Sequence, residues 1–322
     1  MIFWWLFLFF TLLQLGFWLL VFAPLGWHAT PPAKRSSDKF PPLTILICAY
    51  NEAGNLSAFL PAVCEQRYPG QLTVLVVDDG STDATAEVLD MMQTRYAALK
   101  VLPLRYDKSA STGKKYALSA GLLQLDTKWV LLTDADCLPA SPAWARKMMG
   151  QVAPPTEIVL GYSPYASRPG LLNRFIRYEA AYTAIQYLSF ALMGIPYMGV
   201  GRNLLYKVEL FHRAGGFKGH EDLLSGDDDL LVNAVARSSN TSFTLQPETF
   251  VYSQPKLKWR DYFRQKSRHV STGARYRPMV LILLMGLSFS HFFHYVCALF
   301  CILQGISTVF VLCTMTLRLI IV

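Results

Sequence analysis

The chain has 322 residues, of which 52% are hydrophobic and only 16% are charged, whereas average soluble domains carry about a quarter charged residues. Its formal net charge is +8, but no nucleic-acid-binding motif occurs. The basic residues gather beside the apolar ends, where anionic lipid headgroups would attract them. The composition therefore argues against a partner nucleic acid and favours a membrane-associated protein. A zinc site or a disulfide framework is not expected either, because no CxxC pair occurs among the cysteines, which stand at positions 48, 64, 137, 297, 301 and 313.

The first 25 residues contain no charged side chain and are mostly apolar. At 1.5 Å per residue, such a helix reaches roughly 30 Å, the thickness of a bilayer's hydrocarbon core. A cleaved signal peptide would have a basic beginning and an apolar stretch of about 7–15 residues, but no Lys or Arg precedes this longer stretch. We therefore expect a retained transmembrane helix at residues 1–25, followed by a linker at 26–42 that is rich in Pro, Ser and Lys.

Strand and helix patterns alternate through the middle of the chain. Short β-branched or aliphatic runs bounded by turn residues predict strands, at 43–49, 72–80, 101–104, 129–136, 157–162 and 242–246. Helical patterns separate the first four of them, through Cys64, from Thr85 to Met92, and from Lys115 to Leu125. This alternation predicts an α/β domain with a mostly parallel sheet and helices on both faces, which binds ligands at the carboxyl ends of its strands.

Acidic or amide side chains follow three of these strands, as Asn51-Glu52, Asp78-Asp79 and Asp134-Ala135-Asp136. Each pair taken singly could be a turn former. Because the carboxyl ends of parallel strands lie along one edge of a sheet, the three together predict a site at that edge. Residues i and i+2 of an extended segment point the same way, so Asp134 and Asp136 suit a hard divalent cation, Mg²⁺ or Mn²⁺, that also binds phosphate oxygens.

Two other phosphate-binding motifs are excluded. Residues 111–115 resemble the end of a P-loop, but that motif needs glycine at Lys108 and Ser or Thr at Lys115. Gly199 and Gly201 fit no GxGxxG pattern, because Leu204 stands where the third glycine belongs. The sequence supports neither a P-loop nucleotide hydrolase nor an enzyme that binds NAD.

A second acidic cluster lies at residues 225–236. Ser225 as an N-cap with Asp228 three residues later would make a capping box at the start of a helix. Three successive aspartates exceed what a cap needs, and like charges so close raise the pKa of one of them. A raised pKa suits a base that takes a proton from a hydroxyl group, so the cluster indicates a catalytic carboxylate.

Residues 171–194 have a broad apolar helical face with Arg174, Arg177 and Glu179 opposite. The pattern fits a core helix, and it also fits an amphipathic helix in the membrane interface. Both interpretations stay open at this point.

Residues 278–322 form a second apolar end, long enough for one tilted transmembrane helix or for two with a turn near Gln304-Gly305. The chain ends in apolar sequence, as expected of a piece of a longer protein. Basic residues flank both ends, and positive charge beside transmembrane segments stays in the cytoplasm. We therefore expect an integral protein of the cell (inner) membrane whose middle domain, residues 43–277, faces the cytoplasm. The flanking basic residues are Lys34, Arg35, Lys39, Lys256, Lys258, Arg260, Arg264, Lys266, Arg268, Arg275 and Arg277.

Six motifs in order resemble those of glycosyltransferase family 2, and the resemblance covers roughly residues 43–277. They are AYNE (49–52), VVDDGSTD (76–83), GKKYAL (113–118), DAD (134–136), SGDDDL (225–230) and QKSRH (265–269). The first two are highly specific, the DAD adds to them, and the last two are looser. The resemblance implies the GT-A fold, a Rossmann-like mostly parallel sheet, and a membrane-bound inverting enzyme that transfers a sugar from a nucleotide-diphosphate sugar.

The resemblance also implies roles for particular residues. Asp134 and Asp136 would bind the metal, Asp134 would also contact the donor, and Asp227 would be the general base. Asp222 is a competing base, but Ser225 stands where the family's leucine should follow it, whereas Leu230 follows Asp227 at the right spacing. The remaining donor-binding residues would be Tyr50, Glu52, Asp78, Asp79, Lys114, Gln265 and Arg268.

His269 replaces the tryptophan that ends the family's Q-x-x-R-W motif. In polymer synthases that tryptophan meets the acceptor sugar, so the replacement argues against processive synthesis. We expect single transfer from a UDP-sugar, or else a guanosine donor, to a lipid or glycan acceptor. A processive polysaccharide synthase, a nucleotidyltransferase of similar fold and a catalytically inactive scaffold are the alternatives.

Overall fold

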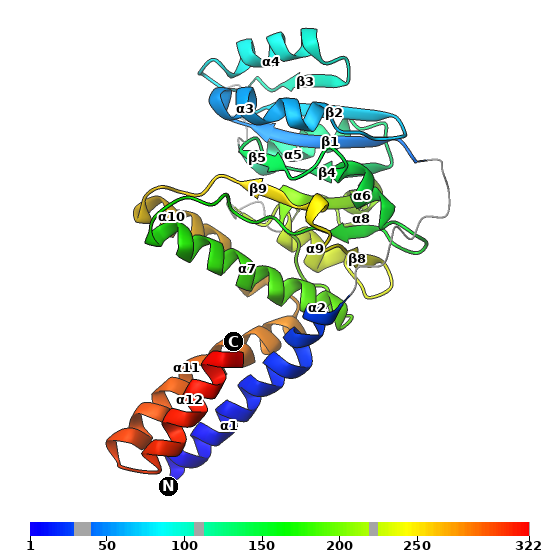
Figure 1. Cartoon of the computed structure of the whole chain (residues 1–322). Coiled ribbons are helices and arrows are strands. Elements are labelled where there is room, and N and C mark those ends of the chain that lie inside the picture. The colour runs from blue at the N-terminus through cyan, green and yellow to red at the C-terminus, as the bar shows by residue number, and fades with distance from the viewer. Residues whose placement is uncertain (29–39, 106–112, 219–224, 322) are drawn as a thin grey trace. The chain divides into compact units, whose positions relative to one another are not determined.

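The computed structural model describes residues 1–28, 40–105, 113–218 and 225–321. Its contacts divide the chain into two compact units (Figure 1). The helical unit consists of Met1–Ala29 and Tyr276–Val322, and the sheet unit consists of Thr30–Arg275. The predicted basic residues Lys34, Arg35 and Lys39 lie outside the described residues, as does most of the expected linker.

The helical unit consists of apolar helices from both ends of the chain. The first is a continuous run of α1 (Ile2–Gly16), the π-helical η1 (Phe17–Phe22) and α2 (Ala23–Trp27), and the others are α11 (Pro278–Leu303) and α12 (Thr308–Ile321). Ile2–Trp27 and Pro278–Leu303 have 26 residues each, and both are long and apolar enough to cross a membrane. α12 is shorter, and a turn at Gly305, which has a positive φ of 67°, separates it from α11 where the sequence predicts a turn.

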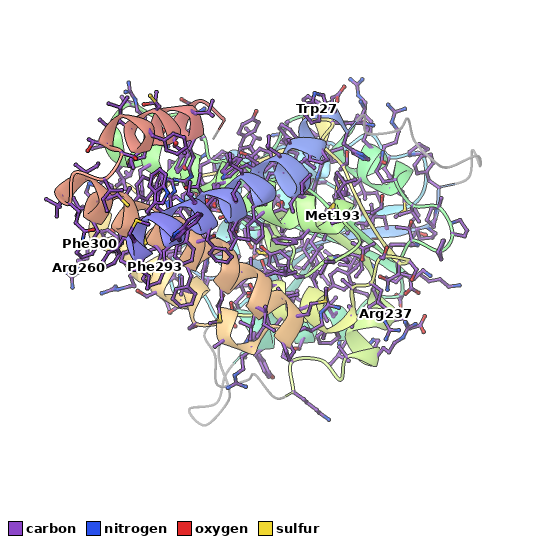
Figure 2. All side chains as sticks on the ribbon, turned by 90° about the horizontal axis from the view of Figure 1, so that it is seen from below. Trp27, Met193, Arg237, Arg260, Phe293 and Phe300 are labelled. Atoms are coloured by element: carbon purple, nitrogen blue, oxygen red, sulfur yellow. The ribbon has the colours of Figure 1, made fainter. Side chains whose placement is uncertain are left out.

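Aromatic side chains join α1 to α11. Phe3 stacks on Phe300 and Phe10 stacks on Phe293, with ring centroids 4.6 and 5.5 Å apart, and Figure 2 shows Phe293 and Phe300 on α11. Such aromatic pairs add about 0.5–1.5 kcal/mol each beyond the area that they bury. The two ends of the sequence therefore pair through specific contacts as well as through their apolar character.

The sheet unit is built on a seven-stranded sheet in the order β3-β2-β1-β4-β7-β6-β8. The strands β1, β2, β3 and β4 run parallel, and so do β6 and β8, while β7 runs antiparallel to both β4 and β6. A separate pair of short strands, β5 and β9, is antiparallel. The strands are β1 (Leu43–Ala49), β2 (Leu72–Asp78), β3 (Leu99–Pro103), β4 (Trp129–Leu132), β5 (Cys137–Pro139), β6 (Ile158–Leu160), β7 (Leu204–Lys207), β8 (Thr241–Phe243) and β9 (Val251–Ser253).

Helices cover both faces of this sheet because its central strands are apolar on both sides. Ile45 and Ile47 of β1 belong to a buried cluster with side chains of α3 (Ala53–Cys64), α4 (Thr85–Arg95) and α6 (Trp144–Gly150). On the other face, α5 (Lys114–Leu123) approaches so closely that a Cβ at Gly121 would lie 2.8 Å from the Leu46 side chain. The predicted α/β architecture is confirmed.

The sheet differs from the prediction in its second half. The sequence predicts no strand at 204–207, yet β7 pairs with β4 and β6 and makes the sheet mixed. The predicted strand 129–136 ends at Leu132, and the acidic segment after it forms a turn that leads into β5. The remaining helices are α7 (Leu171–Leu192), η2 (Gly201–Asn203), α8 (Val208–Arg213), α9 (Asp229–Val235), η3 (Pro247–Thr249), α10 (Trp259–Val270) and η4 (Gly273–Arg275).

Helix α7 is buried in its second half and exposed in part of its first half. Its second half is buried, with Tyr187 and Leu188 each 1% exposed, while Leu171, Phe175 and Tyr178 in its first half are exposed. Phe175 contacts Trp259 and Tyr262 of α10, with ring centroids 5.7 Å apart in both pairs. The first half of α7 and the helix α10 therefore form one aromatic surface.

Candidate active site

A pocket of about 420 Å³ opens at the carboxyl ends of β1 and β4, within the sheet unit. The sheet register explains its position: Leu46 of β1 pairs with Leu132 of β4, so the segments that follow both strands reach the same edge. Nine of the ten residues predicted for the site line this pocket, and they are Tyr50, Glu52, Asp79, Lys114, Asp134, Asp136, Asp227, Gln265 and Arg268. The other lining residues are Cys48, Ala49, Gly113, Ala135, Ser225 and His269.

The loops after β1 and β2 are fastened to each other by Asn51. Its φ of 56° is left-handed, which asparagine tolerates better than most residues. Its backbone N–H donates to Ser81 Oγ at 2.9 Å, and its Oδ1 accepts from the backbone N–H of Thr82 at 2.8 Å. These bonds fix the loops that carry Tyr50, Glu52 and Asp79, so the first two motifs of the sequence form one structural element.

Asp78 is the one predicted residue that does not line the pocket. Its side chain is buried, and Oδ1 accepts from the backbone N–H of Ser81 at 3.1 Å, which is the turn-forming role that such a residue can have. Asp79 does line the pocket. Burial, followed by the charge of Asp78, raises the pKa of Asp79, and burial likewise raises the pKa of Glu52.

Lys114 connects the two acidic clusters of the sequence. Its Nζ lies 2.9 Å from Asp134 Oδ1 and 3.2 Å from Asp227 Oδ2. Burial acts to raise the pKa of Asp227, but the charge of Lys114, its hydrogen bond to Asp227, a backbone hydrogen bond and the charge of Lys115 together hold that pKa below the ordinary value. Residues more than 90 positions apart in the sequence thus converge on one ammonium group.

The helix after the second acidic cluster begins differently from the prediction. Its N-cap is Asp228, not Ser225, and Asp228 Oδ1 accepts from the backbone N–H of Asp229 at 2.8 Å. Burial, followed by the charges of Asp227 and Asp229, raises the pKa of Asp228 to about 7. The expected raised pKa therefore belongs to Asp228 rather than to Asp227, because Lys114 pairs with Asp227. Asp222, the competing base, lies outside the described residues.

The carboxylates after β4 fit a hard divalent cation. Ligand atoms of Asp134, Asp136 and Cys137 lie within 4.8 Å of one another, and burial, followed by the charge of Asp134, raises the pKa of Asp136. A cation between the two carboxylates would relieve that repulsion. Cys137 is a poor ligand, because burial raises the pKa of its thiol well above the ordinary value and a metal binds the thiolate.

Helix α10 brings Gln265, Arg268 and His269 to the pocket. Burial, followed by the charges of Lys266, Arg202 and Arg268, lowers the pKa of His269 to about 4. The imidazole is therefore neutral at physiological pH. This ring, at the position of the family's tryptophan, offers an uncharged planar surface that is smaller than an indole.

Sequence patterns did not identify three residues at or beside the pocket. Cys48 lines it because it lies one position before the predicted motif, at the end of β1. Gly113, with a φ of 113°, lines it at the start of α5. Arg202 lies beside it, where its charge acts on Asp134, Asp136 and His269. No recurring spacing marks Cys48 or Arg202. Gly113 is noted in the sequence only as the first residue of the GKKYAL motif.

Comparisons with known proteins agree with this geometry. The chain is 23% identical over 248 residues to the probable glycosyltransferase YdaM of Bacillus subtilis, covering 74% of this chain and 56% of that protein. It is 28% identical over 216 residues to the glycosyltransferase AglE of Haloferax volcanii, covering 65% of each. The chain thus spans less than two thirds of the length of these two relatives.

Among solved structures, the chain resembles the mannosyltransferase PcManGT of Pyrobaculum calidifontis, which was solved in complex with GDP-Man and Mn²⁺. The TM-score is 0.67 at 19% identity, and the match covers 98% of this chain and 91% of that one. The model of the family described as glycosyltransferase like family 2 matches residues 41–272. The match includes most of the chain and every predicted motif, so the chain belongs to glycosyltransferase family 2, and its sheet unit has the GT-A fold.

Proposed function

We propose that the chain is a membrane-bound inverting glycosyltransferase that transfers one sugar from a nucleotide-diphosphate sugar to a lipid or glycan acceptor. The observation that carries the proposal is the convergence of Asp134 and Asp227 on Lys114 in one pocket. The proposed metal-binding carboxylate and the candidate base are therefore close enough for one sugar to contact both. The family favours glycosyl transfer over the nucleotidyl transfer that a DxD motif alone would also allow.

The donor would occupy the side of the pocket formed by the loops after β1 and β2. Tyr50, Glu52 and Asp79 would hold the nucleoside, with Asp78 fixing the turn below them. The cationic groups of Lys114 and Arg268 would face the diphosphate, where they stabilise the charge that develops on the leaving group, and Gln265 would donate a hydrogen bond to it. A UDP-sugar is the expected donor, and GDP-sugars are the alternative, since the similar mannosyltransferase was solved with GDP-Man.

A divalent cation, Mg²⁺ or Mn²⁺, would be held by Asp134 and Asp136, and when bound it supplies a Lewis acid that offsets the charge of the departing nucleoside diphosphate. The protein's contribution is the placement of these carboxylates at the end of a rigid buried strand. The Mn²⁺ of the similar mannosyltransferase supports this assignment.

Asp227 would be the general base. Its carboxylate is ionised at neutral pH because of Lys114, and it would take the proton of an acceptor hydroxyl that attacks the anomeric carbon from the face opposite the leaving group. The configuration at that carbon is then inverted. Asp228, whose oxygens accept backbone N–H groups, would hold the base loop in place without meeting the substrate.

A lipid acceptor at the cytoplasmic face of the inner membrane is supported by three features. Two helices are long and apolar enough to cross a bilayer. The surface shared by α7 and α10 exposes Phe175, Trp259 and Phe263, and aromatic residues are enriched where protein meets the membrane interface. Basic residues flank this surface, as anionic headgroups would require, and they are Arg174, Arg177, Lys256, Lys258, Arg260 and Arg264.

Single transfer is favoured over processive synthesis by His269. Its neutral imidazole is smaller than the tryptophan of polymer synthases and offers less stacking area to an acceptor sugar. A processive enzyme has to retain its growing polymer after each transfer, and a smaller stacking surface holds the polymer less tightly.

The proposal is tested with purified full-length protein and a panel of radiolabelled nucleotide sugars, with and without Mn²⁺. Asp227→Asn should lower transfer to lipid or glycan by at least about 100-fold, the scale of general-base catalysis, and leave nucleotide-sugar binding nearly intact. Asp136→Ala should lose metal-dependent nucleotide binding. Asp90→Asn, at an exposed position of α4, is the matched control and should behave as wild type.

Two results would contradict the assignment. Full transfer activity in Asp227→Asn would remove that residue from the base role, and unchanged metal-dependent binding in Asp136→Ala would remove the metal from the DAD motif. If no nucleotide sugar is hydrolysed or transferred by the wild-type protein under any condition, the chain is a scaffold with the shape of an enzyme.

A further inference from the structure

Arg202 is a cation beside the candidate active site for which the proposed donor chemistry has no use. Its guanidinium group lies over the ring of Tyr165, 4.6 Å from the centroid, and is also hydrogen-bonded to that residue. Among the described residues, no carboxylate lies within ion-pair distance of it, although the side chain is only partly exposed. Asp134 and Asp136 act on it only at longer range. A charge withdrawn from water without a direct ionic partner is costly, so the guanidinium group suits an anionic ligand.

The backbone that carries Arg202 is rigidly held on both sides. The N–H of Gly201 donates to Asp228 Oδ2. Asn203 donates from Nδ2 to the carbonyl groups of Tyr162 and Thr249, at 2.8 Å each, and accepts from Trp144 Nε1 at 2.9 Å. The guanidinium group is thus presented by a fixed turn and an aromatic face, the preorganisation that a binding residue needs.

The position of Arg202 differs from that of the two cations assigned to the donor. Lys114 contacts the first aspartate of the DAD motif, and Arg268 projects from α10. Arg202 instead comes directly after Gly201, whose backbone N–H binds Asp228, the residue that follows the proposed base. Its aromatic partner Tyr165 packs with Ile176 of α7 and Tyr262 of α10, the two helices of the exposed aromatic surface. Arg202 therefore lies between the base loop and the proposed lipid-facing helices.

We propose that Arg202 determines acceptor specificity by binding a phosphate group carried by the acceptor. The inference rests on the proposed function, because it assigns an acceptor class to the same site. A guanidinium group presents a planar fork of N–H donors that matches two phosphate oxygens. Tyr165 covers one face of that fork and takes one of its hydrogen bonds, and the remaining N–H groups would bind the ligand. The acceptor would then be a phosphate-bearing amphiphile, whose apolar part the aromatic surface of α7 and α10 would receive.

The test compares ligands that differ only in the phosphate. Full-length protein in detergent is titrated calorimetrically with decyl phosphate, with decanol, and separately with UDP and GDP in the presence of Mn²⁺. The wild type should bind decyl phosphate at least about tenfold more tightly than decanol, as a charge-assisted contact implies. Arg202→Gln should weaken decyl phosphate binding roughly 10- to 100-fold and leave decanol and nucleotide binding within about twofold.

Two further variants separate charge from structure. Arg202→Lys keeps the charge without the fork and should retain part of the preference for phosphate. Arg237→Gln removes an exposed arginine, labelled in Figure 2, and should change none of the affinities. Near-equal melting temperatures of all variants would show that the turn around Asn203 is intact.

The proposal is overturned if the wild type binds decyl phosphate and decanol equally. It is also overturned if Arg202→Gln loses nucleotide affinity and keeps decyl phosphate affinity, because the phosphate contacted would then be the donor's. Equal losses in Arg202→Gln and Arg237→Gln would show a nonspecific charge effect and overturn it too. Failure of the proposed function would look different, since no nucleotide sugar would then bind or react whatever residue stands at position 202.

Discussion

Lys114 holds the candidate site together when no donor is bound, because it pairs with both Asp134 and Asp227. A metal at the proposed site and Lys114 would compete for the same carboxylate of Asp134. Removing the ammonium group should therefore help a metal to bind alone and hinder a nucleotide. The side chain is about half exposed, which keeps the effect small.

We predict that Lys114→Met raises the affinity for Mn²⁺ in the absence of nucleotide roughly two- to fivefold, the scale of an exposed ion pair, and lowers the affinity for nucleotide sugar. Titration followed by Mn²⁺ electron paramagnetic resonance measures the first effect. Lys147→Met, which breaks a 2.8 Å ion pair with Glu248 away from the pocket, should leave Mn²⁺ binding unchanged. An unaltered Mn²⁺ affinity in Lys114→Met would show that Lys114 does not shield Asp134.

His269 links the site to the pH dependence of stability. Its pKa is about 4 in the folded protein and 6.5 when unperturbed. Between these values the unfolded chain binds more protons than the folded one, so the free energy of unfolding rises as the pH rises from about 4 to about 6.5. Because the His269 side chain is itself exposed, solvent screening keeps the gain well below the roughly 1.4 kcal/mol per pH unit of a fully shielded group.

We predict that His269→Gln loses this gain, because a neutral amide binds no proton in either state. Above pH about 6.5, where the imidazole is neutral in both states, the variant and the wild type should be most alike, and the wild type should lose stability relative to the variant as the pH falls toward about 4. Chemical unfolding of the sheet unit in the full-length protein, repeated across this range, measures the difference. His212→Gln, at an exposed position of α8, should follow the wild type, and parallel curves for His269→Gln and the wild type would contradict the lowered pKa of the imidazole.

At the residue level, the sequence identifies side chains that recur in motifs and misses those whose role depends on their surroundings. Asp134 and Asp227 were found because each ends or begins an element in a recognisable pattern. Arg202 was not, since a single arginine after a glycine has no pattern of its own. The sequence predicts a raised pKa for one of the three aspartates but not which one, because the ion pair between Lys114 and Asp227 joins segments that are far apart in the sequence.

Among the elements, most strands were predicted, and those that were not are β5, β7 and β9. The strands β1 and β2 have seven residues each and were found at the right places. β7 has four residues, and it leads directly into α8. Alternation of apolar and polar side chains is hard to recognise over four positions. The antiparallel pairing of β7 with β4 depends on tertiary contacts that the local sequence does not encode.

A polar layer crosses the interior of the apolar helical unit. Arg318 of α12 is 3% exposed. Its Nη2 atom donates to Gln14 Oε1 of α1 at 2.8 Å and lies 2.8 Å from His291 Nδ1. Gln14 Nε2 donates to Ser290 Oγ of α11 at 2.6 Å. Residues 1–28 and 276–322 contain no Asp or Glu, so neutral hydrogen-bond acceptors hold the arginine in place.

We predict that Gln14→Leu destabilises the helical unit by about 1–3 kcal/mol, because it leaves buried donors of Arg318 without their acceptor. The double variant Gln14→Leu with Arg318→Leu should recover most of the loss, since two apolar side chains replace the polar pair. Thermal unfolding in detergent, monitored by circular dichroism, measures all three proteins together with Arg318→Leu alone. Additive effects of the two substitutions would show that the contact contributes nothing to the stability of the unit.

For the whole molecule, composition predicts apolar ends and a catalytic middle, and the contacts of the structure divide the chain into a helical unit and a sheet unit. The expected boundary between the catalytic domain and the last helices, at residue 277, differs by two residues from the division at Tyr276. The pairing of the two ends was not predictable, because apolar stretches of similar composition carry no signal for which helix lies beside which. Contacts such as those of Gln14 and Phe300 supply that signal only once the helices are adjacent.

We infer that the aromatic surface of α7 and α10 would be a second means of membrane contact, in addition to the apolar helices. Phe263 of α10 is 58% exposed, and it stacks on Trp259 with centroids 5.8 Å apart. Met91 of α4 is equally exposed, at 58%, and lies on a helix that carries no such surface. Water gives no reason to expose a stacked aromatic pair beside several arginines, whereas the bilayer interface favours that combination.

We predict that a photo-crosslinking p-benzoylphenylalanine at position 263 labels lipid in vesicles that contain anionic phospholipid, and that the same group at position 91 does not. The yield at position 263 should fall at least about threefold in vesicles of zwitterionic lipid alone, because each basic residue near the surface contributes about 1 kcal/mol to binding. Equal exposure of the two positions means that water accessibility alone cannot produce a difference. Equal yields at 263 and 91 would contradict the interface, and they would leave the phosphate-bearing amphiphile proposed for Arg202 without an apolar surface to receive it.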